Sequence, residues 1–156
     1  MSNRPYRERT EDDRNPFGTL LIVDDDMEDC FLYQRALADI GVKNKVNFMG
    51  DGSELLHYPD QNLRSSKNSH TPHLILLDLN MSRLDGREAL RFIKLDRDFK
   101  KILVIILTTS RNPDDVLETY SLGASPFIQK PDNYGGLVSL FKLLNEYWLR
   151  TAVLPD

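Results

Sequence analysis

Short, continuous apolar runs alternate along the chain with longer segments in which apolar residues recur at helical spacing. The runs lie at 20–23, 46–49, 74–77, 103–107 and 127–129, and the first, third and fourth are apolar throughout. Uninterrupted apolarity is expected of parallel strands that are covered on both faces, whereas a strand with one wet face alternates. The pattern therefore predicts five strands of a buried parallel sheet.

The segments between these runs carry helix signals. In the first segment Cys30, Tyr33, Leu37 and Ile40 recur at three- and four-residue spacing, and Gly41 stands just past the end. This combination of an apolar face and a terminal glycine predicts an amphipathic helix.

Helix starts can be placed for the next two segments. Asp51 with Glu54 forms a capping-box pattern, which predicts a short second helix. A third helix is expected to begin near Gly86 and to bury Leu90 and Ile93.

Two further helices complete the series. Asn112 followed by Pro113 and two acids is an N-terminal signature, and Gly123 closes that helix. The last helix is expected near 134–149, with four residues on one side: Leu137, Phe141, Leu144 and Trp148.

Strands alternating with helices predict an α/β fold with a doubly wound parallel sheet, because right-handed crossovers place helices on both faces. A length of 156 residues fits one domain. We expect a disordered N-terminal arm at 1–16, the folded domain at 17–149 and a C-terminal arm at 150–156. The polar segment 59–72 is expected to be a surface loop.

Composition excludes several classes of protein. With 40% hydrophobic and 28% charged residues, the chain has ordinary globular composition, and its apolar runs are too short to span a membrane. The start of the sequence lacks the apolar stretch of a signal peptide, so we expect a cytoplasmic protein. Cys30 is the only cysteine, which excludes an intrachain disulfide. A net charge of −4 without a dense basic stripe argues against nucleic-acid binding.

Polar residues gather where the predicted strands end, which is where doubly wound folds place their functional crevice. Asp24 and Asp25 follow the first strand, Asp78 the third, Thr108 the fourth and Lys130 the fifth. Singly, each type has an ordinary role as a helix cap, a turn residue or a solvated charge. Together they predict a site for a hard, oxygen-seeking cation: Mg²⁺ fits best, and Mn²⁺ is possible.

At these positions the sequence resembles the response-regulator receiver domains. The segments LLIVDDD, LILLDLNMSRLDG, VIILTTS and GASPFIQKP are similar to the signature blocks of that family, in order, over residues 18 to about 148. The resemblance implies a flavodoxin-like fold with strand order 2-1-3-4-5. It also implies a regulator that accepts a phosphoryl group from a sensor histidine kinase, catalyses its own phosphotransfer and dephosphorylation, and is not a conventional enzyme.

The resemblance assigns roles to individual residues. Asp78 is the implied phospho-acceptor. Asp25 and Asp78 are expected to bind Mg²⁺ directly together with the backbone carbonyl of Asn80, and Asp24 to act through water. Thr108 is the implied switch hydroxyl.

Two residues of the fifth strand region complete the assignment. Lys130 is the implied amine that binds the phosphoryl group. Phe127 is either an aromatic residue coupled to the switch or simply a core residue. Thr108, Asp78 and Lys130 form the expected catalytic set.

Two positions depart from the family pattern. Ser82 stands where the family usually carries Pro, so the loop after Asp78 is expected to be less rigid, although Asp85 and Gly86 preserve the following turn. Thr109 is bulkier than the Ala or Ser that is common there. Neither departure removes a catalytic group, but both affect the expected lifetime of the phosphorylated state.

A narrower resemblance concerns the C-terminal end. The last helix running into EYWLRTAVLP is similar to small single-domain regulators that pair with phytochrome-type histidine kinases. Ala152, Val153 and Leu154 are apolar where a disordered tail is expected to be polar. They either fold back on their own domain or pack on a two-fold mate, and we expect the second arrangement, a homodimer.

Other functions are compatible with parts of this pattern. An aspartyl-phosphate phosphatase or phosphotransferase would also use Asp78, but Asn80 stands where such hydrolases carry a second acid. A flavin carrier could share the fold, although the acidic loop after the first strand disfavours a flavin phosphate. A receiver-like interaction module that is never phosphorylated is the remaining alternative.

Overall fold

The computed structural model describes residues 19–64 and 72–153, and within them five parallel strands form one sheet in the order β2-β1-β3-β4-β5. The strands are β1 (Thr19–Val23), β2 (Lys45–Met49), β3 (Pro72–Leu77), β4 (Leu103–Thr108) and β5 (Phe127–Gln129). The expected fold class and strand order are confirmed. The expected N-terminal arm at 1–16 and Leu154 of the C-terminal segment lie outside the described residues.

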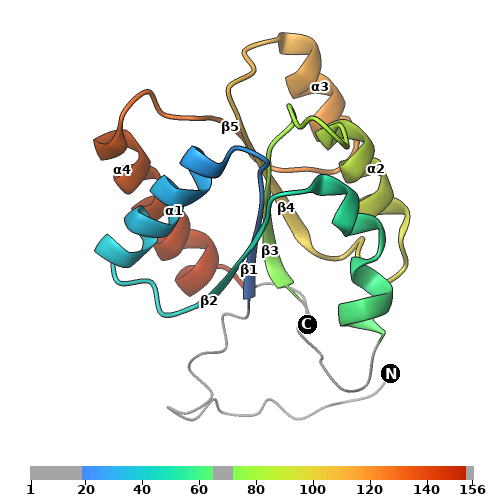
Figure 1. Cartoon of the computed structure of the whole chain (residues 1–156), viewed down its shortest axis with the longest axis horizontal. Helices are drawn as coiled ribbons and strands as arrows, with labels where there is room; N and C mark the ends of the chain where they lie inside the picture. The colour runs from blue at the N-terminus through green and yellow to red at the C-terminus, as the bar shows by residue number, and fades with distance from the viewer. Residues whose placement is uncertain (1–18, 65–71, 154–156) are drawn as a thin grey trace.

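Helices cover both faces of the sheet. The helices α1 (Met27–Asp39) and α4 (Tyr134–Leu144) lie on one face, and α2 (Gly86–Leu95) and α3 (Pro113–Ser121) lie on the other (Figure 1). This arrangement is the one that right-handed crossovers between parallel strands produce.

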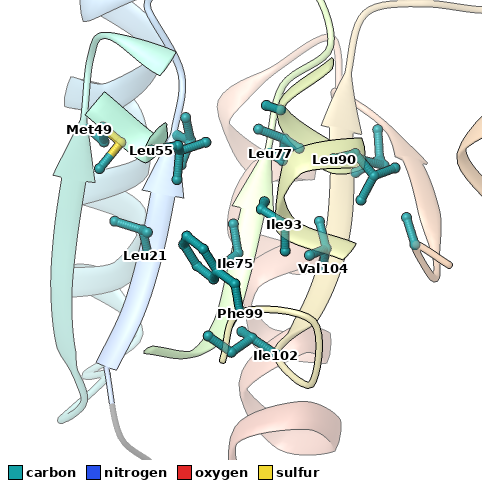
Figure 2. Close-up of a cluster of buried hydrophobic side chains, with 14 of the residues drawn as sticks. Leu21, Met49, Leu55, Ile75, Leu77, Leu90, Ile93, Phe99, Ile102 and Val104 are labelled. Carbon is teal, nitrogen blue, oxygen red and sulfur yellow. The ribbon is translucent and has the colours of Figure 1, made fainter. Parts of the chain in front are cut away.

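The two faces of β1 explain its continuous apolarity. Leu21 and Val23 belong to the core under α2, which we call the first core and part of which is shown in Figure 2. Leu20 and Ile22 belong to the core under α1 and α4, which we call the second core. Because successive side chains of a strand point to opposite faces, every position of a doubly covered strand must be apolar.

Capping residues and glycines mark the helix ends, and those at Asn112, Gly41 and Gly123 agree with the sequence signals. Asp26 caps α1 by accepting hydrogen bonds from the N–H groups of Glu28 at 3.0 Å and Asp29 at 3.1 Å. Asn112 caps α3, which begins at Pro113. Gly41 and Gly123 follow their helices with φ of 70° and 95°, where a side chain would be strained.

The segment after β2 differs from the sequence expectation. Asp51 caps a helical turn, but that turn is the 3₁₀-helix η2 (Gly52–Leu56) instead of an α-helix. A π-helix, η3 (Pro59–Leu63), then occupies part of the expected loop at 59–72, so the loop prediction is wrong there. Burial of Leu55 and Tyr58 in the first core holds this stretch against the domain.

The last helix changes its pitch. The helix α4 continues as a π-helix, η4 (Asn145–Thr151). A π-helix has more residues per turn, so the buried position after Leu144 falls one residue later than α-helical spacing predicts. Leu149 is 2% exposed, whereas Trp148, which was expected on the buried side, is half-buried and packs against the edge of the second core.

The start of α2 lies directly against the backbone after β3. The Gly86 N–H donates to the Leu79 carbonyl at 2.9 Å, and a Cβ on Gly86 would lie 2.2 Å from the Asp78 carbonyl oxygen. Backbone atoms cannot yield by that distance without a shift of the chain. Because Gly86 has no side chain, α2 can begin in direct contact with the Asp78 backbone and hold that backbone in place.

We predict that Gly86→Ala lowers the free energy of unfolding by roughly 2–3 kcal/mol, because the methyl group must displace α2 or the Asp78 backbone. Gly135→Ala is the matched control: its Cβ would lie 3.4 Å from the nearest neighbour, in the first turn of α4. It should leave stability within about 1 kcal/mol of wild type. Urea unfolding of both variants gives the comparison, and equal stabilities would contradict the packing argument.

Candidate metal centre at the carboxyl ends of the strands

Three carboxylates meet at the ends of β1 and β3. The strand ladder extends one residue past each strand, because the Asp24 N–H donates to the Met49 carbonyl at 3.1 Å and the Asp78 N–H to the Val23 carbonyl at 3.0 Å. Asp24, Asp25 and Asp78 can each offer an oxygen within 4.8 Å of the others. The structure therefore brings together the acidic residues that the sequence singled out.

The burial of this cluster makes its charge costly. Asp24 is 2% exposed and Asp78 is 6% exposed, while Asp25 is partly exposed. Burial raises the pKa of Asp24 above its ordinary value, although a hydrogen bond from Lys130 acts in the opposite direction. An all-oxygen set of converging carboxylates fits a hard divalent cation, whose charge would offset this repulsion.

A pocket of about 290 Å³ opens beside Asp25, the member of the acidic cluster that is partly exposed. Its other lining residues come from the loops after β2 and β3: Gly50, Asp51, Gly52, Met81, Ser82 and Arg83. The backbone N–H of Ser82 donates to Asp25 at 2.8 Å. The family's usual proline has no N–H, so Ser82 supplies a contact that proline could not supply.

Lys130 lies at the centre of the carboxylates. Its Nζ donates to Asp24 at 2.9 Å, to Asp78 at 3.1 Å and to Asp29 at 2.7 Å. Burial by itself lowers the pKa of Lys130, but the hydrogen bonds to Asp29 and Asp24 outweigh it, and the net effect raises the pKa. Lys130 therefore carries its positive charge throughout the physiological pH range.

Asp29 is a member of this cluster that sequence reasoning missed. It stands in the first turn of α1, where an acid is ordinarily explained by the helix dipole. Nothing in its spacing from Asp24 marks it as a partner of a lysine 101 residues away in the sequence. Tyr33, which donates its hydroxyl to Asp24 at 3.2 Å, is a second such residue.

Thr108 and Phe127 lie on neighbouring strands, apart from the carboxylate contacts. Thr108 is fully buried, and its Oγ1 accepts the Ser110 N–H at 3.3 Å. Phe127 is partly buried against the first core, and its N–H donates to the Tyr120 hydroxyl at 3.1 Å. Among the hydrogen bonds of residues 19–64 and 72–153, none joins the Thr108 hydroxyl to Asp78.

A second polar network connects α2 to the loop after β4. Arg87 forms ion pairs with Asp85 and with Asp115, and the Ser110 hydroxyl donates to Asp115 at 2.5 Å. The hydrogen bond from Arg87, with that from Ser110, holds the pKa of Asp115 below its ordinary value. The network ties the segment that follows Thr108 to the first turn of α2.

A scan against protein-family models matched residues 20–142 to the response regulator receiver domain. The chain belongs to this family. The matched region contains Asp24, Asp25 and Asp78 together with Lys130.

Curated and solved relatives agree with this assignment. Response regulator Rcp1 of Synechocystis sp. is 36% identical over 144 residues, covering 92% of this chain and 97% of the relative. The structure of the phosphorylated cyanobacterial phytochrome response regulator RcpA has a TM-score of 0.80 at 39% identity, and covers 89% of this chain and 99% of that one. The Mn²⁺-bound structure of Rcp1 has a TM-score of 0.79 at 34% identity, covering 89% and 99%.

Between residues 19 and 64 and between 72 and 153, no helix combines the length and the apolar character that crossing a membrane requires.

The Asp115 network predicts a pH-dependent loss of stability. Because its pKa is lowered in the folded state, Asp115 contributes stability above its ordinary pKa of 3.8, and this contribution is lost as the pH falls through the folded-state pKa. Asp115→Asn should therefore lower the free energy of unfolding by about 1–2 kcal/mol at pH 7, and by progressively less below pH 3.8. Urea unfolding from pH 7 to pH 3 measures the difference.

Asp114→Asn is the control for this prediction, since Asp114 is also an acid in the first turn of α3 and, among the contacts of the described residues, none joins it to Arg87. The loss of unfolding free energy in Asp114→Asn should be smaller than in Asp115→Asn, and it should not decrease in the same way as the pH falls. If Asp115→Asn lowers the free energy of unfolding by the same amount over the whole pH range, the assigned pairing of Asp115 with Arg87 is contradicted.

Proposed function

We propose that this chain is a single-domain response regulator of a two-component phosphorelay, which accepts a phosphoryl group from a sensor histidine kinase on Asp78. One observation carries the proposal: the Asp78 carboxylate belongs to the acidic cluster that could hold a cation and also lies 3.1 Å from the Lys130 ammonium. The family membership and the phosphorylated relative RcpA support it.

The acidic cluster would hold the cation in this reaction. We assign Mg²⁺ as the physiological ion, with Mn²⁺ as a substitute, since Mn²⁺ is present in the structure of Rcp1. Asp25 and Asp78 would bind it directly with the Asn80 carbonyl, and Asp24 through water. When bound, the cation supplies positive charge that neutralises the oxygens of the phosphoryl group.

The side chains of this chain then have separate tasks. A carboxylate oxygen of Asp78 attacks the phosphorus of a phosphohistidine, the O–P bond forms, and the P–N bond to the imidazole breaks. Lys130 pairs with a phosphoryl oxygen, as an ammonium does with developing negative charge. Attack by water on the same phosphorus later releases phosphate and restores Asp78.

Thr108 and Phe127 are proposed to carry the signal. The Thr108 hydroxyl would leave the Ser110 N–H and donate to a phosphoryl oxygen, so a negative charge on Asp78 would move the segment after β4. Phe127 lies on the adjacent strand and contacts the first core. The displaced surface would then bind a different protein partner.

We further propose that the partner is a phytochrome-type histidine kinase and that the protein acts in the cytoplasm without contacting nucleic acid. RcpA is a phytochrome response regulator, and its match with this protein covers 89% of the present chain. The net charge of −4 is consistent with a protein partner in place of a nucleic acid.

The test of the proposed function is phosphorylation by acetyl phosphate, followed by intact-mass measurement. We expect one added phosphoryl group in Mg²⁺ and none in chelator or in Asp78→Asn. Asp26→Asn is the matched control, because it removes a carboxylate from the same acidic run, and asparagine caps a helix as well as aspartate does. It should be phosphorylated at nearly the wild-type rate.

Two outcomes would contradict the proposal. If Asp78→Asn accepts the phosphoryl group as fast as wild type, the acceptor is assigned wrongly. If wild type stays unmodified with acetyl phosphate, with beryllofluoride and with a phosphorylated phytochrome-type kinase, the chain is an interaction module that is not phosphorylated.

We also propose that the protein forms a homodimer through its C-terminal end. Leu143, Tyr147 and Val153 are 65%, 57% and 88% exposed at this end of the chain. Apolar side chains that cluster near a terminus favour burial in an isologous contact, and dimers with two-fold symmetry are the commonest soluble assemblies.

Light scattering on the full chain and on a chain that ends at Thr151 tests the dimer. Ending the chain there preserves η4 and the buried Leu149, which a shorter chain would remove. We expect the full chain to dimerise and the truncated chain to dissociate at least tenfold more readily, about 1.4 kcal/mol. A monomeric full chain, or equally tight dimers of both chains, would refute the role of the C-terminal segment.

A further inference from the structure

The hydrogen-bonding capacity of Lys130 is fully used in this structure. An ammonium has three N–H donors and no acceptor. The three donors of Lys130 have three carboxylate partners, with Asp29 at 2.7 Å, Asp24 at 2.9 Å and Asp78 at 3.1 Å. When Asp78 becomes an acyl phosphate, the N–H donor that it holds passes to one phosphoryl oxygen. Lys130 can therefore bind a second phosphoryl oxygen only if Asp24 or Asp29 gives up its contact.

Asp24 and Asp29 remain carboxylates in the phosphorylated state, and they differ in what the loss of Lys130 would cost. The Asp24 side chain is 2% exposed, that of Asp78 is 7% exposed and that of Asp29 is 29% exposed. A carboxylate that loses a cationic partner inside the protein is left as an uncompensated buried charge, whereas one near the surface can be rehydrated.

The other contacts of Asp24 and Asp29 also favour the release of Asp29. Asp24 also accepts from the Tyr33 hydroxyl at 3.2 Å and from the Asp26 N–H at 2.9 Å, so it is fixed in place. Asp29 belongs to the first turn of α1, where the helix dipole stabilises a carboxylate that has no other partner. Asp29 is thus the partner that can leave with the smallest penalty.

We propose that Asp29 is a positioning residue that holds the Lys130 ammonium in the unphosphorylated state and releases it to the phosphoryl group on Asp78. This inference rests on the proposed function and adds to it a regulatory element outside the strand ends. Asp29 competes with the phosphoryl group for one N–H donor, so it lowers the affinity of the site for a phosphoryl group and shortens the lifetime of the phosphorylated state.

Asp29→Asn tests the competition, because asparagine keeps the shape of the side chain but removes its charge. Beryllofluoride with Mg²⁺ is the probe, since it mimics a phosphoryl group on an aspartate without a covalent step. The loss of one charge-assisted hydrogen bond at a partly exposed position should tighten beryllofluoride binding by roughly three- to tenfold. The half-life of the acetyl phosphate product should lengthen in the same direction.

Glu28→Gln is the matched control. Glu28 is the other acid in the first turn of α1, and Lys130 has no hydrogen bond to it among the described contacts. Both substitutions remove one negative charge from the same helix end, where the helix dipole favours an acid. Glu28→Gln should leave beryllofluoride affinity within about twofold of wild type.

A measurement on the wild-type chain is independent of any variant. The carboxyl ¹³C resonance of Asp29 should shift when beryllofluoride is added, because the side chain exchanges Lys130 for water. The carboxyl resonance of Asp39, which accepts from the Tyr134 hydroxyl on the far end of α1, should stay unchanged.

The outcomes separate this inference from the proposed function. If wild type binds beryllofluoride but Asp29→Asn binds it no more tightly, or if the Asp29 resonance does not move, Asp29 is not the exchanging partner and only this inference fails. If wild type neither binds beryllofluoride nor accepts phosphate from acetyl phosphate, the proposed function itself fails.

Discussion

The arrangement at the strand ends depends on the balance between one ammonium and a group of buried carboxylates. Asp24 and Asp78 are nearly inaccessible to water, and their mutual repulsion is offset within the described residues by Lys130. One positive charge cannot neutralise this cluster, so its carboxylates favour the binding of a divalent cation. A reaction that changes the charge of the site would alter this balance. The proposed phosphoryl acceptance on Asp78 depends on such a divalent cation, which with Lys130 would neutralise the oxygens of the incoming group.

The surrounding fold serves to keep this cluster in register. Backbone hydrogen bonds continue past β1 and β3 and fix Asp24 and Asp78 side by side. The start of α2 packs on the Asp78 backbone through Gly86. On the next strand, Thr108 is buried beside the site but bonded to Ser110, whose hydroxyl leads to Asp115 and Arg87. In the proposed switch, a Thr108 hydroxyl that turned toward a phosphorylated Asp78 would leave Ser110, whose contacts lead to the α2 and α3 surface.

The sequence allowed the local part of this structure to be predicted. The strands, the cap at Asn112, and the meeting of Asp24, Asp25 and Asp78 follow from periodicity, from local capping signals and from the geometry of parallel strands. The π-helices η3 and η4 could not be predicted, because they depend on how Tyr58 and Leu149 pack into the cores. The pairs Asp29–Lys130 and Arg87–Asp115 were missed for a related reason: each joins side chains from distant elements, and no sequence pattern marks such a pair.

The central claim is that Asp78 is the residue that becomes an acyl phosphate. Borohydride reduction of the phosphorylated chain converts an aspartyl phosphate to homoserine, and tandem mass spectrometry of the resulting peptides locates the modified residue. The account predicts homoserine at position 78 alone, in a yield that follows the phosphorylated fraction. Homoserine at position 24, 25 or 29, or a phosphorylated chain that yields no homoserine, would contradict it.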